Sequence, residues 1–207
     1  MKRVVEAEIL DELDAKDPRA IRSRRDLRLV NWFMRGESWI LSELQKIDGL
    51  KRVVELGAGD GILAAQITEE LPNVEVVCVD LIDRPQGLNQ RVKWWQGDVL
   101  DYDGYNDDTV VIANLFLHHL SSSGLMDLGG MMHQARGVLA AEPHRGALSM
   151  MMSRCLFPFV NDVTQHDMTV SIRAGFRNTE VAGLIGGKWQ WSQHRSVFGG
   201  IRTMGVK

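Results

Sequence analysis

A strand-like run that leads into three closely spaced glycines most constrains how this chain can fold. Arg52–Leu56 reads Arg-Val-Val-Glu-Leu, and Gly57, Gly59 and Gly61 follow before a helical stretch that begins at Ile62. Glycine has no side chain to obstruct a tight turn or a close ligand. In an α/β protein such a strand-to-helix turn lies at the carboxyl edge of the sheet, where ligands bind. The pattern therefore predicts a site for a nucleotide-like ligand.

Two features of this loop distinguish between the kinds of ligand that glycine-rich strand-to-helix turns bind. Ile62 stands where the dinucleotide-binding fingerprint has a third Gly or Ala. Glu55 precedes the loop and Asp60 lies inside it, and carboxylates would repel a pyrophosphate at a helix N-terminus. S-adenosylmethionine (SAM) has no phosphate and carries an ammonium and a sulfonium. The acidic loop therefore favours SAM, and an NAD-dependent oxidoreductase is the less favoured alternative.

From Lys51 onward, short β-rich runs alternate with helical stretches. Near-continuous runs of Val, Ile and Leu indicate strands that are covered on both faces, and the alternation predicts a parallel sheet with right-handed crossovers. The predicted strands are Arg52–Leu56, Val74–Asp80, Val92–Gln96, Thr109–Asn114 and Val138–Glu142. At the end, Lys188–His194 alternates large apolar with polar residues, and Val197–Val206 follows closely, which predicts a hairpin.

The first part of the chain has no strand-like run. Pro18 begins a helix and Gly36 ends it, and Ile21, Leu27 and Val30 recur at helical spacing as its buried face. We expect residues 1–50 to form a helical extension that closes over the site as a lid, and residues 51–207 to form the main domain. The other helix face is rich in arginine, including Arg24 and Arg25, and is either solvated or holds an acidic group of a substrate.

Composition excludes several classes of protein. With 24 Lys and Arg against 27 Asp and Glu, the net charge of −3 disfavours a nucleic-acid partner. The two cysteines, Cys78 and Cys155, do not make a disulfide framework, which fits the cytoplasm. The most apolar segment, 147–160, contains two serines and an arginine and is shorter than the ~20 residues of a membrane span, so none is expected.

Polar residues end the successive predicted strands in an order that suits one ligand. Asp80 ends the second strand, where a carboxylate can take both ribose hydroxyls. Asp98 and Val99 follow the third strand, and Asp98 can accept from an adenine amino group. Asn114 and Leu115 end the fourth strand beside the methionine end. A lone Asp is as often a strand-end or cap residue, but several in strand order favour a cofactor site.

The chain resembles the class I SAM-dependent methyltransferases in four motifs. The resemblance implies a doubly wound, Rossmann-like α/β sheet of seven strands, mostly parallel, with the last strand antiparallel. It also implies that Ala58 and Leu81 contact the cofactor together with Glu55, Gly57 and Gly59, and that S-adenosylhomocysteine (SAH) is the product. The motifs are Val53–Gly61, Val79–Leu81, Gln96–Asp98 and Asn114–Leu120.

A finer resemblance links the chain to bacterial small-molecule methyltransferases associated with type III polyketide synthase clusters. It rests on Arg22–Arg28 with Asn31, on Glu142–Arg145, and on 163–167 with 171–176. The resemblance implies a phenolic, quinol-like or polyketide-like acceptor. It also implies that Arg24, Arg25, Asn31, His118 and Arg145 belong to the substrate site or its lid.

Methyl transfer is an in-line displacement on an activated sulfonium, so positioning supplies most of the acceleration. A base is needed where the acceptor must lose a proton, and imidazole suits that role. His119 and His166 are the candidates, although either can instead be a packing, capping or loop-anchoring residue. The adjacent pair His118 and His119 lacks a third ligand at a productive spacing, so no metal is expected.

These features together predict a methyltransferase that O-methylates an aromatic or polyketide-like small molecule. C-methylation of a similar acceptor is an alternative, as is a SAM-binding regulatory or partner subunit without turnover. A homodimer is left open.

Overall fold

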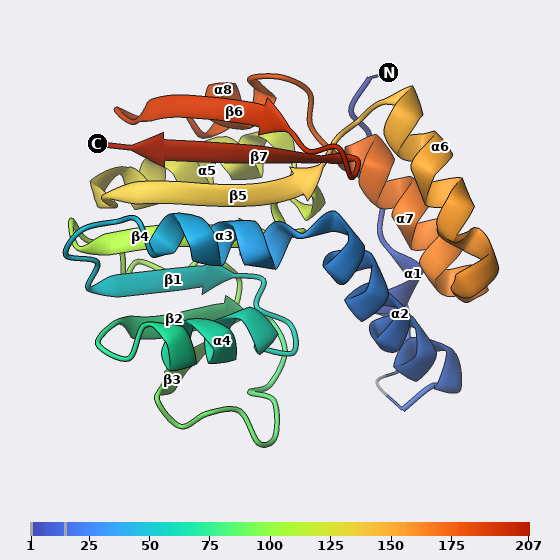
Figure 1. Cartoon of the computed structure of the whole chain (residues 1–207), viewed down its shortest axis with the longest axis horizontal. Coiled ribbons are helices and arrows are strands. Elements are labelled where there is room, and N and C mark those ends of the chain that lie inside the picture. Colours follow the sequence, from blue (N-terminus) through green and yellow to red (C-terminus); the bar gives the residue numbers. More distant parts are fainter. Residues whose placement is uncertain (1, 15) are drawn as a thin grey trace.

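A seven-stranded sheet in the order β3-β2-β1-β4-β5-β7-β6 forms the centre of the computed structural model, which describes residues 2–14 and 16–207 (Figure 1). Strands β1 to β5 pair in parallel, and β7 pairs antiparallel with both β5 and β6. The predicted mostly parallel sheet with an antiparallel terminal hairpin is confirmed. The strands are β1 Arg52–Leu56, β2 Glu75–Asp80, β3 Val92–Gln96, β4 Thr109–Asn114, β5 Gly137–Pro143, β6 Gln190–Arg195 and β7 Gly200–Val206.

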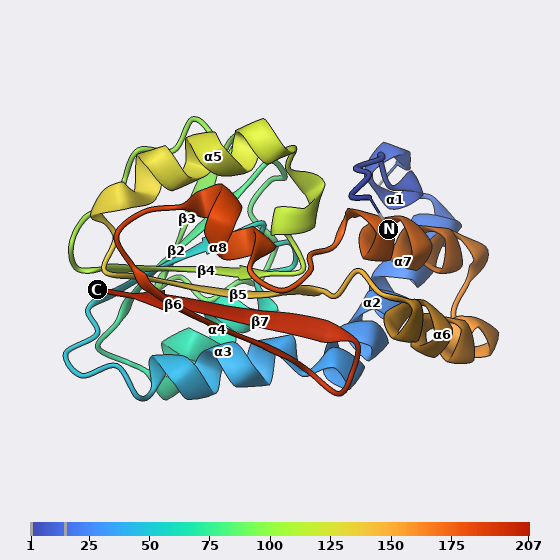
Figure 2. The ribbon, with the colours of Figure 1, turned by 90° about the horizontal axis from the view of Figure 1, so that it is seen from above.

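Helices cover both faces of the sheet (Figure 2). On one face lie α3 (Gly36–Leu44) and α4 (Ile62–Glu70), and on the other lie α5 (Ser122–Met131) and α8 (Glu180–Ile185). Each interface is a separate apolar cluster, because side chains of β1, β2, β4 and β5 point alternately to the two faces. The strand residues are apolar on both sides for this reason, as the sequence predicted.

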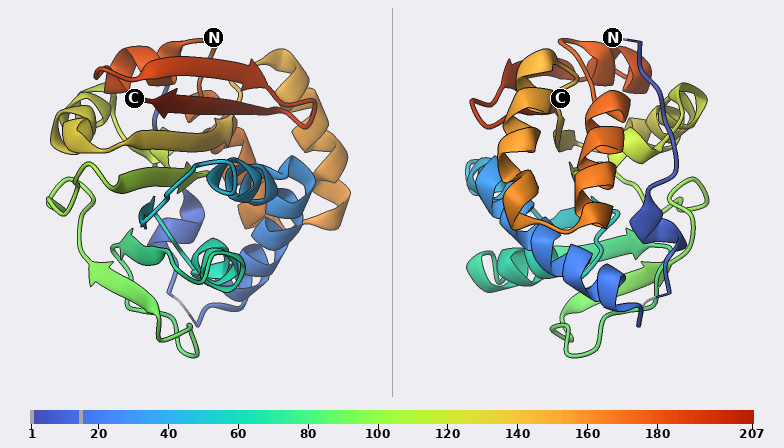
Figure 3. Two further views of the ribbon diagram at one scale, coloured as in Figure 1. Left: turned by 60° about the vertical axis from the view of Figure 1, so that its left-hand side comes forward. Right: turned by 90° about the vertical axis from the view of Figure 1, so that its right-hand side faces the viewer.

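A third group of helices lies beyond the carboxyl ends of the parallel strands (Figures 1 and 3). It consists of α1 (Ile9–Glu12), α2 (Pro18–Met34), α6 (Ala147–Leu156) and α7 (Asp162–Ala174). The N-terminal segment runs along α7, where the Val4 N–H donates to the Arg173 carbonyl at 3.3 Å. The Arg3 Nε also donates to the Ala174 carbonyl at 2.8 Å. Three short 3-10 turns, η1 Leu117–His119, η2 Met132–Gln134 and η3 Phe157–Phe159, complete the structure described.

Helix α2 differs from its prediction at its end and in its buried face. It ends at Met34 because Arg35 takes a left-handed conformation (φ 55°), and Gly36 begins α3. Ile21, expected to be buried, is 57% exposed. The buried face is partly polar instead, since α7 offers it polar partners: Ser23 Oγ lies 2.8 Å from Thr164 Oγ1. The apolar periodicity was wrong at Ile21, whereas Val30, on the same predicted face, is buried against Val160 and Met168.

Among residues 2–14 and 16–207, no helix is both long and apolar enough to span a bilayer. Cys78 is buried in β2 and Cys155 is exposed on α6, and both are free thiols. This agrees with the absence of a disulfide framework that the sequence predicted.

Candidate functional site

A cavity of about 750 Å³ lies between the carboxyl ends of the strands and the outer group of helices. The right-hand view of Figure 3 looks onto this edge of the sheet, framed by α2, α6, α7 and the N-terminal segment. Most of the residues predicted for the site line the cavity. They are Glu55, Gly57, Ala58, Gly59, Asp80, Leu81, Asn114, Leu115, Arg24, Asn31, His118 and His119.

The glycine loop requires its glycines. Gly57, Gly59 and Gly61 have φ angles of 65°, 53° and 68°, a region that side chains disfavour. A Cβ on Gly57 would lie 2.0 Å from the Phe116 ring, whereas a Cβ on Gly59 would meet nothing within 4 Å. Gly57 is therefore fixed by packing, and Gly59 leaves space at the cavity wall.

Asp80 connects the ends of two neighbouring strands. Its Oδ2 accepts from the Gly59 N–H at 2.7 Å, and its Oδ1 accepts from the Ile82 N–H at 3.1 Å. Each oxygen keeps a second lone pair, because an ionised carboxylate accepts about four hydrogen bonds. The side chain is half-buried and lines the cavity, so it is held in place and still able to bind a ligand's hydroxyls.

Acidic and amide oxygens gather on the wall near β1 and β4. Burial, with the Glu37 carboxylate nearby, raises the pKa of Glu55 to about 8. Burial also raises the pKa of Glu37, which accepts from Asn31 Nδ2 at 3.2 Å. The side-chain oxygens of Asn31 and Asn114 are buried without a hydrogen-bond partner among the described residues. Buried acceptors normally have partners, so this wall is suited to a cationic donor such as an ammonium.

Glu142, at the end of β5, organises the turn after β4. Leu115 adopts a left-handed conformation (φ 54°), and the chain then bends so that the Phe116 and Leu117 N–H groups donate to Glu142 Oε1 at 3.0 and 2.8 Å. The other carboxylate oxygen lies 2.7 Å from His118 Nδ1. Burial alone would lower the pKa of His118, but hydrogen bonds to Glu142 and Glu8 raise it to about 9.

His119 follows in the same turn and is more open to the cavity, with 31% of its side chain exposed. Its Nε2 lies 3.9 Å from Glu8 Oε1, and its Nδ1 lies 3.8 Å from Asp11 Oδ2. Burial and the neighbouring His118 lower the pKa of His119. Its imidazole is therefore neutral at neutral pH and can accept a proton.

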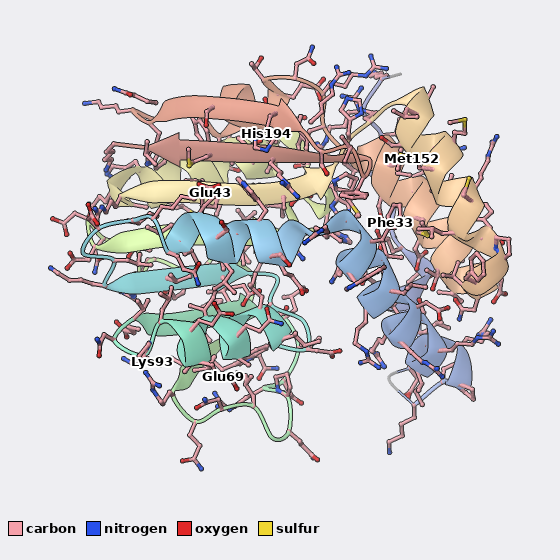
Figure 4. All side chains as sticks on the ribbon, in the orientation of Figure 1. Phe33, Glu43, Glu69, Lys93, Met152 and His194 are labelled. Carbon is pink, nitrogen blue, oxygen red and sulfur yellow. The ribbon has the colours of Figure 1, made fainter. Side chains whose placement is uncertain are left out.

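The other end of the cavity is apolar. Its side chains come from α2, α6, α7 and the β6–β7 connection, including Phe33, Met152, Met168, Ile172 and Phe198. In Figure 4, Phe33 on α2 and Met152 on α6 lie at the same end of the sheet, beyond the strand ends. The cavity thus joins a polar half at the strand ends to an apolar half under the outer helices.

No protein-family model matches the chain. The plantazolicin methyltransferase BpumL, solved with SAH, superimposes with a TM-score of 0.69 at 11% identity, over 92% of this chain and 91% of that chain. The chain has the class I methyltransferase fold. Human N-acetylserotonin methyltransferase, solved with SAM, superimposes with a TM-score of 0.63 at 14% identity, over 95% of this chain and 61% of that chain.

A sequence match agrees with this methyltransferase fold over part of the chain. Uncharacterized methyltransferases of Mycobacterium bovis and Mycobacterium tuberculosis are 31% identical to it over 90 residues. The match covers 40% of this chain and 46% of each relative, so it spans about half of the curated relatives.

Five predicted site residues lie outside the cavity lining of this methyltransferase fold. Asp98 is exposed and its Oδ1 accepts from the Leu100 N–H at 2.9 Å, while Val99 is buried in the core. Arg25 is exposed on α2, and Arg145 is buried, with its Nε donating to the Gly175 carbonyl at 3.0 Å. The His166 side chain is 49% exposed, and its Nδ1 lies 3.1 Å from Asp167 Oδ1.

Glu8, Glu37 and Glu142 are among the acidic residues of the site that sequence reasoning missed. Glu142 belongs to a motif that carried the family resemblance, and its place at a strand end was a usable signal. Glu37 lies one residue after the turn between α2 and α3. Glu8 precedes a four-residue helix in a segment without periodicity, so no sequence pattern could assign it to the site.

Proposed function

We propose that the chain is a SAM-dependent methyltransferase that acts on an apolar small molecule and releases SAH. The observation that supports it most strongly is the acidic wall of the cavity beside the glycine loop. Glu55, Glu37, Asn31 and Asn114 offer carboxylate and unpartnered amide oxygens there. A cationic ligand favours the ionised form of Glu55, and SAM carries two positive centres, whereas a phosphate would disfavour that form and meet mainly acceptor oxygens.

The residues present fit this cofactor along its length. Glu55 and Asn114 would hold its ammonium, and Asp80 would accept from both ribose hydroxyls, while Gly57 and Gly59 leave the backbone free of side chains. Leu81 would cover the adenine, which we place toward Asp98 and Val99 at the end of β3. When bound, SAM supplies an activated methyl group. The protein's contribution is then mainly positioning and exclusion of water.

The apolar half of the cavity supports an aromatic, quinol-like or polyketide-like acceptor. Side chains such as Phe33, Met152 and Phe198 offer no charged partner and would pack on rings or alkyl chains. His119 lines the same cavity with an imidazole that is neutral at neutral pH. It would promote loss of the proton from a phenolic hydroxyl, which favours O-methylation.

Titration calorimetry with SAM, SAH and NAD tests the cofactor. We expect binding of SAM and SAH and no binding of NAD, and the reverse result contradicts the proposal. Incubation with methyl-labelled SAM and a panel of phenols and catechols then tests the activity. Label in an ether product supports O-methylation. SAM binding without transfer to any phenolic or carbon acceptor would instead indicate a SAM-binding subunit.

A further inference from the structure

Three side chains with metal-ligand chemistry meet at the wall of the cavity. Glu8 comes from the N-terminal segment, and His118 and His119 come from the turn after β4. One ligand atom from each lies within 4.8 Å of the other two. All three residues line the cavity. The third ligand that the histidine pair lacks in sequence is therefore supplied from a distant part of the chain.

The spacing of these atoms leaves room for an ion. Glu8 Oε1 lies 3.6 Å from His118 Nε2 and 3.9 Å from His119 Nε2. Both distances are longer than ordinary hydrogen bonds, which span about 2.7–3.2 Å. Bonds of about 2.0–2.2 Å to one tetrahedral metal put neighbouring ligand atoms roughly 3.4 Å apart. The ligand atoms of the two histidines lie within 4.8 Å of each other, so shifts of about 1 Å around a cation would bring all three atoms to one metal.

The surrounding groups already orient these side chains. Glu142 Oε2 lies 2.7 Å from His118 Nδ1, which directs the opposite ring nitrogen toward Glu8. Metal-bound histidines typically use their second nitrogen in this way, with a carboxylate that fixes the ring. The Ser171 hydroxyl donates to Glu8 Oε1. Asp167 accepts from the Ile9 and Leu10 N–H groups at 2.8 and 3.1 Å, and so anchors the segment that carries Glu8.

The charge of the cluster also favours a cation. Glu8 and Glu142 are 8% and 1% exposed, and Asp11 and the buried Asp167 lie close by. The Arg3 guanidinium is a positive group close to this cluster, since it donates to the His118 and Leu120 carbonyls. Buried carboxylates need compensation. The four carboxylates Glu8, Asp11, Glu142 and Asp167 outnumber Arg3 and the His118 ring together, and a divalent ion would offset the excess.

We propose that Glu8, His118 and His119 form a binding site for a divalent first-row transition-metal ion, with Zn²⁺ as the test ion. Two imidazoles and one carboxylate suit such ions, whereas Mg²⁺ and Ca²⁺ prefer oxygen ligands. Three protein ligands leave a coordination position, and the cavity lies beside it. An acceptor hydroxyl bound there would ionise at a lower pH, so that the ion, held by His119, would promote the proton loss in place of the free imidazole; this role rests on the proposed methyltransferase function.

The test uses untagged full-length protein that has been treated with a chelator and dialysed. Calorimetry with Zn²⁺ measures stoichiometry and affinity, and visible absorption of the Co²⁺ form reports the ligand field. We expect one ion per chain. Glu8→Gln, His119→Ala and Glu142→Gln should each weaken Zn²⁺ binding at least about tenfold, the usual effect of losing a ligand or its orienting partner. Glu12→Gln, at the end of the short helix α1 that follows Glu8, and His133→Ala, on the surface, are the matched controls and should bind normally.

Circular dichroism and SAH calorimetry on each variant show that it is folded and that the cofactor half is intact. Absence of stoichiometric metal binding in the wild type overturns the inference, as does equal affinity in Glu8→Gln and His119→Ala. SAM and SAH binding without metal binding refutes this site alone. Metal binding without SAM or SAH binding supports the site and refutes the proposed function.

Discussion

Asp80 Oδ2 accepts a 2.7 Å hydrogen bond from the Gly59 N–H, so the carboxylate at the end of β2 is tied to the glycine loop after β1. The bond holds the loop in its left-handed conformation and holds the carboxylate at the cavity wall. One contact thus serves both the fold and the proposed ribose site.

Asp80→Asn should weaken SAH binding by at least about tenfold, or 1.4 kcal/mol. Asparagine keeps one acceptor oxygen but cannot accept from two hydroxyls and the loop N–H as a carboxylate does. Calorimetry measures the affinity. Asp101→Asn, an exposed residue near the end of β3, is the control and should bind as the wild type does. Unchanged SAH affinity in Asp80→Asn would show that Asp80 does not bind the cofactor.

Gly57→Ala should destabilise the protein by at least about 2 kcal/mol, because a left-handed φ and a clash with Phe116 add together. Gly130→Ala is the matched control. It lies exposed in α5, and a Cβ there meets nothing within 4 Å. Alanine at that position should be neutral or stabilise the helix by up to about 1 kcal/mol. Urea unfolding of both variants compares the two effects, and equal stabilities would contradict the packing argument.

The free energy of unfolding of the ligand-free protein should fall as pH rises from about 4.5 to about 8. Burial raises the pKa of Glu55 to about 8 from its ordinary 4.5, so the folded state binds more protons than the unfolded state across this window. The slope from this residue is at most about 1.4 kcal/mol per pH unit. Glu55→Gln should flatten it in urea titrations at several pH values. A slope that is the same in both proteins would show that Glu55 titrates normally.

The same residue gives a test of cofactor binding. A cationic ligand beside Glu55 stabilises its ionised form, so SAM binding at pH 7 should release a proton. The apparent binding enthalpy should then vary with the ionisation enthalpy of the buffer, and Glu55→Gln should lose this variation. Dependence on the buffer that persists in the variant would assign the proton to another group.

The sheet and the loop were predictable because local patterns specify them. Arg52–Leu56, Val92–Gln96 and Thr109–Asn114 are strands at the predicted bounds, since apolar runs of that length suit strands buried on both faces. The glycines of the turn after β1 also form a local sequence pattern, so the turn was predictable too. Ile21 was predicted wrongly because its exposure depends on polar partners that α7 offers to other residues of α2.

The acidic half of the site depended on contacts between distant residues. Glu8 reaches the cavity because the Asp167 carboxylate caps the N-terminus of α1, and nothing in the sequence near Glu8 encodes that contact. The division into residues 1–50 and 51–207 stays a prediction. Within the first part, α3 packs on the sheet through Trp39, Ile40 and Leu44, whereas α1 and α2 lie over the cavity.

The two histidines predicted as bases occupy different environments, and this leads to a contrast between variants. His119 lines the cavity and has a lowered pKa, whereas His166 is half-exposed and outside the lining. His119→Ala should reduce transfer of labelled methyl to a phenol by about 10²-fold while SAH affinity stays unchanged, because the residue acts on the acceptor proton. His166→Ala should leave both quantities near the wild-type values. Transfer at the wild-type rate in both variants would show that His119 does not remove the proton, and would leave positioning as the main source of catalysis.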